Sequence, residues 1–219
     1  KPMANFLAGV GGLWGIPMWA FYVNRGQGLT SFGVQNKDGA IQGFATAEKA
    51  YQDTAFTGFR TFLKGEGNGQ CFTHMPFFPA AVTDSASTKY ERNMHIGMNE
   101  FEIFERAEDI ELDTNILYFT IPDEDFPALV RQTTFKNTGR GPLKLDVLDG
   151  LAKLIPSGLT NIGEATMGRT LEAWMKVYNV GNGMGDSSRP FFHITQGTAD
   201  TSTVQLIKEG HFAVSYIEG

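Results

Sequence analysis

The stretch Trp19–Phe44, WAFYVNRGQGLTSFGVQNKDGAIQGF, decides the fold class of this chain. It divides into three apolar runs of strand length, which two polar, glycine-containing connections separate at 24–28 and 35–39. The pair Asp38-Gly39 favours a hairpin, because both central positions of a type I′ turn require positive φ. We therefore predict three short antiparallel strands, at Trp19–Val23, Leu29–Val34 and Ala40–Phe44.

Length and composition favour a domain that is built mainly from strands. A chain of 219 residues can bury a sizeable core, and all-β domains of this length are common. Its 18 phenylalanines and 26 glycines suit many short strands joined by turns better than a helical bundle. The net charge of −6 argues against nucleic acid as a partner, because phosphates call for clustered Lys and Arg.

Strand signals continue along the chain and are interrupted once by helical spacing. Apolar residues recur near helical spacing at Glu164–Tyr178, where we predict one short helix, and Thr46–Tyr51 is long enough for one helical turn. The turn Thr138–Pro142 is predicted to join its two flanking strands as an antiparallel pair. The further predicted strands are Gly58–Lys64, Cys71–Phe78, Tyr90–His95, Met98–Glu105, Asn115–Ile121, Ala128–Asn137, Leu143–Leu148, Phe191–Thr195, Thr203–Ile207 and Phe212–Ile217. This pattern describes a large antiparallel β-sandwich, mainly β, with one short helix.

Three acidic or reactive features have simple structural interpretations. The acidic run Glu105–Asp113 is interpreted as a solvated edge that discourages pairing between sheets. Asp149-Gly150 is interpreted as a turn, and Cys71 as a small core residue. The histidines lack the paired spacing of metal ligands and a single cysteine cannot form a zinc cluster, so we expect no metal site and no disulfide.

The ends of the sequence bear on its cellular context. Neither a signal peptide nor about 20 unbroken apolar residues is present, so we expect no membrane span, and the single cysteine fits a cytoplasmic protein. The chain opens at Lys1 without an initiator Met and closes on a predicted strand. We therefore expect a longer parent polypeptide.

Two segments carry a family resemblance. Asn115–Pro122 (NILYFTIP) and Ala128–Gly158 (ALVRQTTFKNTGRGPLKLDVLDGLAKLIPSG) resemble the N-terminal β-sandwich of inverting glycoside phosphorylases, the relatives of cellobiose phosphorylase and β-oligoglucan phosphorylase. The matching pieces are a strand that ends at Pro, an Arg-x-Thr-x-x-Asn-Thr-Gly strand and turn, and Leu-Asp-Gly-Leu leading to Ile-Pro-x-Gly. The segments VNRGQGLTSFGVQNKDGAI and GFRTF are similar to the oligoglucan-acting branch.

The resemblance implies a galactose-mutarotase-like supersandwich that covers residues 1–219 as one domain. In that family an (α/α)6 barrel, absent from this sequence, supplies the Asp that protonates the glycosidic oxygen, while inorganic phosphate attacks the anomeric carbon from the other side. The chain alone would then contain no catalytic residue and no cofactor, and would be inactive. The implied partners are inorganic phosphate, a β-linked gluco-oligosaccharide, the chain's own barrel and a second copy in a homodimer, with no nucleic acid or membrane.

Six polar residues are the candidates for substrate binding or for a domain interface. Five of them crowd the connections of the opening hairpins, and the sixth lies in the middle of a strand, where a guanidinium needs a partner. Planar polar groups pair well with adjacent sugar hydroxyls while an aromatic ring stacks on the sugar face. The alternative is a set of solvated turns and a surface arginine. The candidates are Asn24, Arg25, Gln27, Lys37, Asp38 and Arg60.

Two other functions stay open from the sequence. The chain could be a non-catalytic carbohydrate-binding or structural sandwich that acts alone. It could also be the sandwich domain of a glycoside hydrolase or lyase, since such a fold does not settle the chemistry. A requirement for phosphate separates a phosphorylase from a hydrolase.

Overall fold

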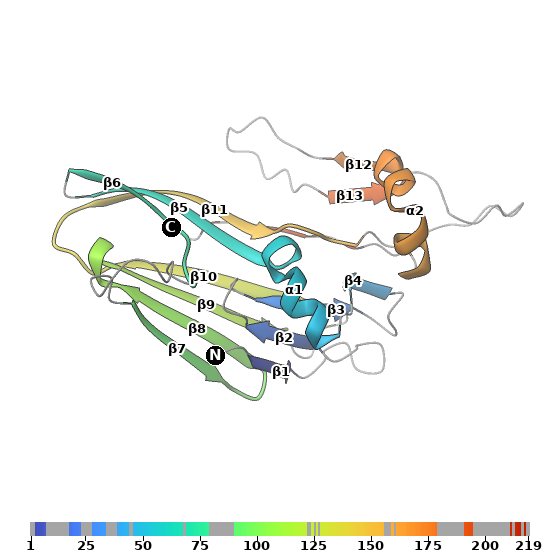
Figure 1. Cartoon of the computed structure of the whole chain (residues 1–219), viewed down its shortest axis with the longest axis horizontal. Coiled ribbons are helices and arrows are strands. Elements are labelled where there is room, and N and C mark those ends of the chain that lie inside the picture. The colour runs from blue at the N-terminus through green and yellow to red at the C-terminus, as the bar shows by residue number, and fades with distance from the viewer. Residues whose placement is uncertain are drawn as a thin grey trace, which may run out of the picture.

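In the computed structural model the chain is mainly antiparallel β-sheet, as Figure 1 shows. The strands have the bounds β1 Met3–Leu7, β2 Met18–Tyr22, β3 Leu29–Gly33, β4 Ala40–Gln42, β5 Phe59–Gly67, β6 Gln70–His74, β7 Tyr90–Ile96, β8 Glu100–Ala107, β9 Leu112–Thr120, β10 Leu129–Asn137, β11 Leu143–Leu151, β12 Met175–Tyr178 and β13 Phe191–Ile194. The helices are α1 Ala47–Thr57, the 3-10 turn η3 Glu108–Ile110 and α2 Asn161–Trp174.

The structure describes a defined part of the chain. The described residues are 3–7, 18–22, 28–33, 39–43, 46–67, 69–78, 90–121, 124, 126, 128–155, 159, 161–178, 191–194, 211, 213–215 and 217. Within them, neither α1 nor α2 combines the length and the apolarity that a helix needs to span a bilayer.

The strands β7 to β10 form a four-stranded sheet in the order β10-β9-β8-β7, with antiparallel neighbours throughout. Alternation along β8 places Phe101 and Ile103 on the buried face, and β9 adds Ile116 and Tyr118 to the same face. These four side chains are at most 1 % exposed. The sheet therefore presents one continuous apolar face to the rest of the domain.

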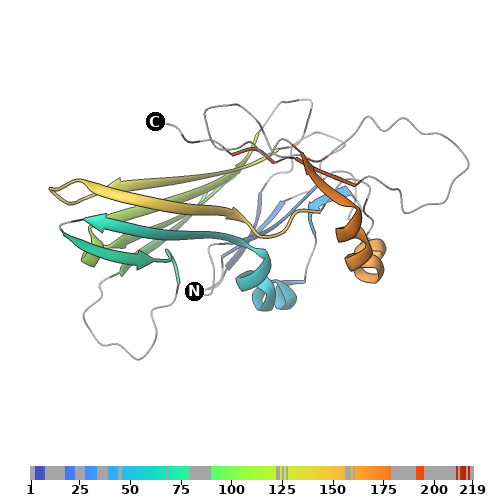
Figure 2. The same cartoon turned by 90° about the horizontal axis from the view of Figure 1, so that it is seen from above.

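A three-stranded sheet in the order β11-β5-β6 covers that apolar face. Figure 1 shows β5, β6 and β11 above β7–β10, and in the view of Figure 2 they lie in front of those strands. The ring of Phe59 on β5 meets Tyr118 on β9 edge to face, with centroids 5.6 Å apart. Phe32 of β3 and Phe77, which follows β6, complete the shared core. The two layers form the predicted β-sandwich.

The predicted pairing of the strands on either side of Thr138–Pro142 is wrong. β10 pairs with β9, whereas β11 pairs with β5, so the turn carries the chain from one sheet to the other. The Thr138 N–H donates to the Glu111 carbonyl, which anchors the turn to the end of the four-stranded sheet. Turn residues signal a change of direction, and they do not specify which sheet the next strand joins.

The opening stretch folds as predicted where it is described. β1 to β4 form a separate antiparallel sheet, and β2, β3 and β4 lie within the predicted ranges or one residue outside them. The Phe59 N–H at the start of β5 donates to the Gly28 carbonyl over 2.9 Å. This bond holds the beginning of β3 against the beginning of β5.

The helical regions differ in length from the prediction. α2 covers Asn161–Trp174, and the last four residues of the predicted helix form β12. The single turn expected at Thr46–Tyr51 is the first part of α1, which has 11 residues. Of the strand predicted at Phe212–Ile217, residues 213–215 and 217 are described and are not in a strand; Ile217 is 97 % exposed. The strand predicted at Thr203–Ile207 lies outside the described residues.

Candidate functional site

Arg60, the predicted mid-strand arginine, is half-buried on β5. Its Nη1 atom is shielded from solvent and has no hydrogen-bond partner. Burial lowers the pKa of this guanidinium, and the nearby Tyr118 hydroxyl opposes that effect only in part. A buried donor without a partner is unfavourable, so an acceptor placed at Arg60 Nη1 would be stabilising.

Two other buried polar atoms without partners belong to the neighbouring strands. They are the Thr30 hydroxyl oxygen on β3 and the Gln42 side-chain oxygen on β4. Thr30 is two residues after Gly28 and Arg60 is one residue after Phe59, and Gly28 and Phe59 are joined by a backbone hydrogen bond. Three of the four unsatisfied buried side-chain atoms in the described part of the chain thus belong to β3, β4 and the start of β5.

The other five predicted residues lie outside the described residues. They are Asn24, Arg25, Gln27, Lys37 and Asp38. The first three belong to the connection that leads into Gly28, whose carbonyl accepts from the Phe59 N–H. The structure therefore brings the end of that connection next to Arg60 through the backbone.

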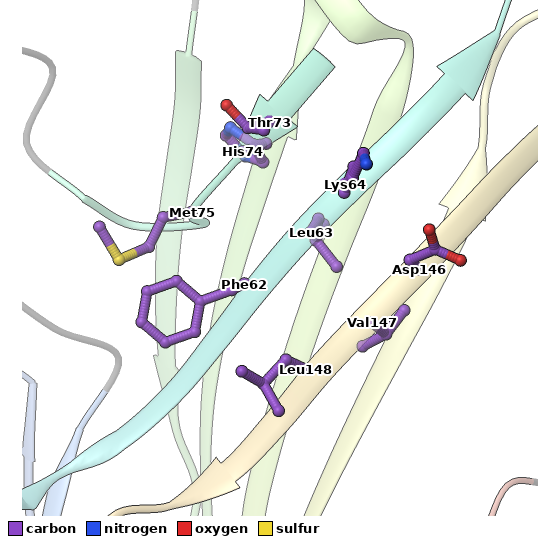
Figure 3. A pocket seen from close by; sticks show the side chains of 9 residues that line it. All are labelled: Phe62, Leu63, Lys64, Thr73, His74, Met75, Asp146, Val147 and Leu148. Atoms are coloured by element: carbon purple, nitrogen blue, oxygen red, sulfur yellow. The ribbon is translucent and has the colours of Figure 1, made fainter. Parts of the chain in front are cut away.

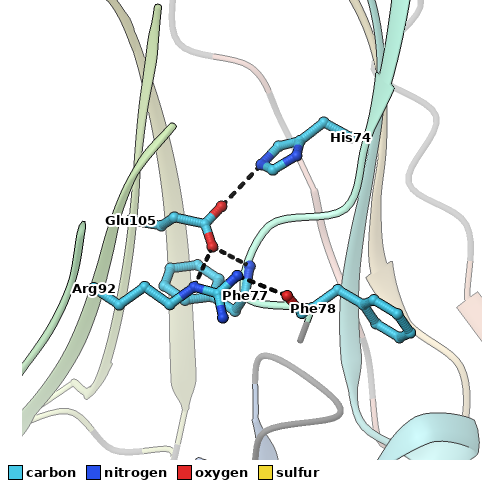
Figure 4. Close-up of polar contacts among 5 residues, drawn as sticks. All are labelled: His74, Phe77, Phe78, Arg92 and Glu105. Atoms are coloured by element: carbon cyan, nitrogen blue, oxygen red, sulfur yellow. Dashed lines mark hydrogen bonds and ion pairs between the residues drawn. The ribbon is translucent and has the colours of Figure 1, made fainter. Parts of the chain in front are cut away.

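A buried carboxylate, Glu105 of β8, links the two sheets (Figure 4). Its side chain is 0 % exposed and lies 2.8 Å from His74 Nε2, which belongs to β6 in the other layer. Arg92 Nε donates to the other carboxylate oxygen over 2.6 Å, and the Phe77 N–H donates to that same oxygen over 2.8 Å. Arg92 also donates to the Phe78 carbonyl, so it fixes the chain that follows β6.

The environment of Glu105 favours its ionised form. Burial alone would raise the pKa of the carboxyl group, but the hydrogen bond from His74, the charge of Arg92 and the Phe77 N–H outweigh burial and hold the pKa below its ordinary value. Both carboxylate oxygens are occupied by donors. Glu105 is therefore an anchor for the segment that follows β6, since each of its oxygens accepts from at least one donor.

A second buried cluster is organised around a cation, Arg131 of β10, with a side chain that is 5 % exposed. Arg131 Nη1 donates to Asp149 of β11 over 2.5 Å, Nη2 donates to Thr61 of β5 over 3.0 Å, and Nε donates to the Tyr118 hydroxyl over 3.1 Å. The Thr61 hydroxyl donates to Asp149 in turn. The guanidinium stacks against the Phe59 ring, 5.0 Å from its centroid.

The Arg131 cluster is electrostatically complete. Burial alone would lower the pKa of Arg131, but the Tyr118 hydroxyl and the Asp149 carboxylate outweigh it, so the pKa is raised. Burial raises the pKa of the Tyr118 hydroxyl, which therefore stays protonated at neutral pH. This cluster ties β10 and β9 to β5 and β11. Its geometry suits structural support, since every charged group in it is paired.

The outer face of the three-stranded sheet carries a groove of about 600 Å³ (Figure 3). Register places Phe62 of β5 opposite Leu148 of β11, and Lys64 opposite Asp146. Figure 3 shows Phe62, Leu148 and Met75 grouped together, with Lys64 and Asp146 further along the two strands. The groove has an apolar floor beside a pair of opposite charges.

Three sequence interpretations are corrected by these sites. Glu105 and Asp113 are buried, at 1 % and 6 % exposure, so only the middle of Glu105–Asp113 is an exposed connection. Asp149-Gly150 is not a turn, because β11 continues to Leu151. The Asp149 carboxylate pairs with Arg131. Cys71 is exposed, since alternation on the edge strand β6 turns it to the outer face.

The sequence contained signals for two of these residues. Glu105 follows Phe101 and Ile103 at intervals of two, which is the spacing of an inward-facing strand position. Arg131 and Thr133 form the Arg-x-Thr motif, and both contact Asp149. Among the described residues, no three His, Cys, Asp or Glu side chains are grouped in a way that could hold a metal ion.

Comparison with protein-family profiles and with curated proteins gave no match.

Proposed function

We propose that this chain is the N-terminal β-sandwich part of an inverting glycoside phosphorylase. The parent enzyme would cleave β-linked gluco-oligosaccharides with inorganic phosphate and release glucose 1-phosphate. The observation that carries the proposal is Arg60, a half-buried guanidinium with an unpaired Nη1 next to the Gly28 end of the polar connection 24–28. The sequence resemblance over Asn115–Pro122 and Ala128–Gly158 indicates that the reaction is phosphorolysis.

Arg60 fits a hydroxyl-bearing ligand or a carboxylate from another domain. A guanidinium presents several donors in a fixed plane, which suits the adjacent hydroxyls of a sugar or the two oxygens of a carboxylate. The Thr30 hydroxyl oxygen and the Gln42 side-chain oxygen are further buried groups without partners, on β3 and β4 of the sheet that the Gly28 carbonyl links to the start of β5. A polar ligand at this end of the sandwich would satisfy groups that the described residues leave without partners.

The reaction divides between this chain and the rest of its parent. A carboxylic acid of the barrel gives its proton to the glycosidic oxygen as the bond from C1 to that oxygen breaks, and a phosphate oxygen forms the new bond to C1 from the opposite face. Phosphate brings its own negative charge, so no second carboxylate is required as a base. The carboxylates of the two ionic clusters, the buried Glu105 and the partly exposed Asp149, are held by donors and support the scaffold instead.

The remaining parts of the proposal concern context. Residues 1–219 would form one domain that packs against the barrel of the same polypeptide, and the parent would act as a homodimer in the cytoplasm. These statements follow from the resemblance and from the composition of the chain.

The test is an assay of the full-length parent protein with β-linked gluco-oligosaccharides, with and without phosphate. Glucose 1-phosphate should form only when phosphate is present. Arg60→Ala should lower kcat/KM for the oligosaccharide by about tenfold or more, because it removes a charge-assisted hydrogen bond. Arg169→Ala, at an exposed position of α2, is the matched control and should leave kcat/KM unchanged.

Two results would contradict the proposal. Release of free glucose at the same rate without phosphate would make the parent a hydrolase. Unchanged kinetics in Arg60→Ala would reduce Arg60 to a part of the scaffold.

A further inference from the structure

The groove on the outer face of β11-β5-β6 exposes apolar side chains that a soluble sheet face normally covers or replaces with polar ones. Phe62 is 45 % exposed and Leu148 is 70 % exposed, and the two lie opposite each other in register. Phe62 belongs to β5, the central strand of the sheet, where it pairs with Leu148 of β11 and directly precedes the part of β5 that also pairs with β6. The aromatic ring is therefore presented on a rigid support.

The charged pair beside this apolar floor is open. Lys64 and Asp146 are opposite each other in register, yet within the described part of the chain neither side chain has a hydrogen-bond or ion-pair partner. The Lys64 ammonium offers donors, and the Asp146 carboxylate offers acceptors. Both groups line the groove together with Thr73.

The charge balance of the groove selects the kind of ligand. A phosphate or a nucleic acid would meet the Asp146 carboxylate, and a basic peptide would meet the Lys64 ammonium. An uncharged ligand with many hydroxyls can use both groups, and the apolar face of a pyranose ring can lie on Phe62 and Leu148. The groove is thus complementary to a neutral saccharide.

Arg60 is not among the residues that line the groove, but it precedes Phe62 by two positions on β5. Side chains alternate along a strand, so Arg60, Phe62 and Lys64 share one face of β5. The distance from Arg60 to Lys64 along the strand is about 13 Å, at about 3.3 Å per residue. This length suits an oligosaccharide better than a single sugar.

We infer that the outer face of β5 and β11 is a binding surface for the β-linked gluco-oligosaccharide, with Phe62 and Leu148 beneath the sugar rings and Lys64 and Asp146 on their hydroxyls. The inference rests on the proposed function for the identity of the ligand. The surface extends the Arg60 site along the strand, and it holds the part of the glucan chain that lies away from the scissile bond.

The experiment measures binding of β-linked and α-linked glucopentaoses to the full-length protein by calorimetry, and locates the bound sugar by hydrogen–deuterium exchange of peptides from β5 and β11. Phe62→Ala should weaken binding of the β-linked pentasaccharide by about tenfold, because it removes the stacking ring. Asp146→Asn combined with Lys64→Met should weaken binding by a similar factor, and it leaves the apolar floor intact. Phe56→Ala, at a position of α1 that is 78 % exposed, is the control and should bind as the unaltered protein does.

Three results would overturn the inference. The first is equal affinity in all variants, and the second is protection from exchange that spares β5 and β11. The third is loss of self-association in Phe62→Ala without a change in affinity, which would make the face an interface between copies. Phosphate-dependent cleavage that persists in any of these cases leaves the proposed function standing. Binding of the oligosaccharide in the groove without phosphate-dependent cleavage would refute the proposed phosphorylase function and leave the binding surface established.

Discussion

The two faces of β5 differ in how far their polar and apolar side chains are buried and paired. On the inner face, Thr61 and Leu63 are 0 % and 3 % exposed, and Thr61 hydrogen-bonds to both Arg131 and Asp149. On the outer face, Arg60 keeps an unpaired nitrogen and Phe62 is nearly half exposed. Consecutive residues of one strand therefore differ: the Thr61 side chain has hydrogen-bond partners, whereas Arg60 Nη1 has none.

This difference shows where the chain holds its stability and where it keeps capacity for a partner. Buried polar groups stabilise a fold only when each donor and acceptor is paired, and removal of one member leaves the others exposed to the full cost of desolvation. Exposed side chains on the outer face carry no such cost of desolvation. Changes on the inner side should therefore lower the free energy of unfolding, whereas changes on the outer side should affect binding.

The largest effect is expected for Arg131→Met. The change leaves Asp149, Thr61 and the buried Tyr118 hydroxyl without their shared donor, and should lower the free energy of unfolding by about 4 kcal/mol. Urea unfolding at neutral pH measures it, with Arg169→Met on the exposed side of α2 as the matched control. A loss below about 1 kcal/mol would show that the cluster is solvated and that the contrast between the two faces is false.

Glu105→Gln should have the next largest effect, about 3 kcal/mol at pH 7, because it leaves Arg92 and His74 without a charged acceptor. The pKa of Glu105 is held below its ordinary value in the folded protein, so its contribution is complete above that ordinary value. The contribution is lost as the pH falls through the lowered pKa. Unfolding curves of the two proteins should converge on acidification.

Glu100→Gln provides the control for this pH dependence. Glu100 lies on the same strand and is exposed. The free energy of unfolding of Glu100→Gln should follow that of the unaltered protein at every pH. A gap between Glu105→Gln and the unaltered protein that stays constant down to acidic pH would exclude the ionised carboxylate as the source of the stability.

The smallest effect is expected for Leu148→Ser on the outer face. Leu148 is 70 % exposed, so the free energy of unfolding should change by no more than about 0.5 kcal/mol. Thermal and urea unfolding of the full-length protein measure it. A loss of 2 kcal/mol or more would mean that another part of the polypeptide covers this face, and the two faces of β5 would then be alike.

Much of the secondary structure could be predicted from the sequence, because it depends on local patterns. The strands predicted at Gly58–Lys64 and Asn115–Ile121 are confirmed, since all but one residue of each range lies in β5 or β9. The pairing of β11 with β5 could not be predicted. It joins residues as far apart as Thr61 and Asp149, which are 88 positions apart, and no local pattern encodes such a contact.

Of the candidate site, the sequence indicates Arg60, because a charged residue interrupts a strand. The structure places its Nη1 atom away from solvent and without a partner, and its role in binding stays a prediction. The five turn residues remain predictions. Phe62, Lys64 and Asp146 were not singled out, because a groove depends on which strands become neighbours and on how far each side chain stays exposed.

The passage of the chain from β10 into β11 has a consequence for the order in which the domain is made. The strands β7 to β10 meet their neighbours soon after synthesis, since each pairs with the next in line. β5 emerges before all of them, yet it must wait for β11, which leaves the ribosome several seconds later at about 5–20 residues per second. During that interval the edge of β5 that later pairs with β11 has no partner strand, and the apolar side chain of Leu63 is not yet covered. A newly made chain would benefit from a chaperone in this period.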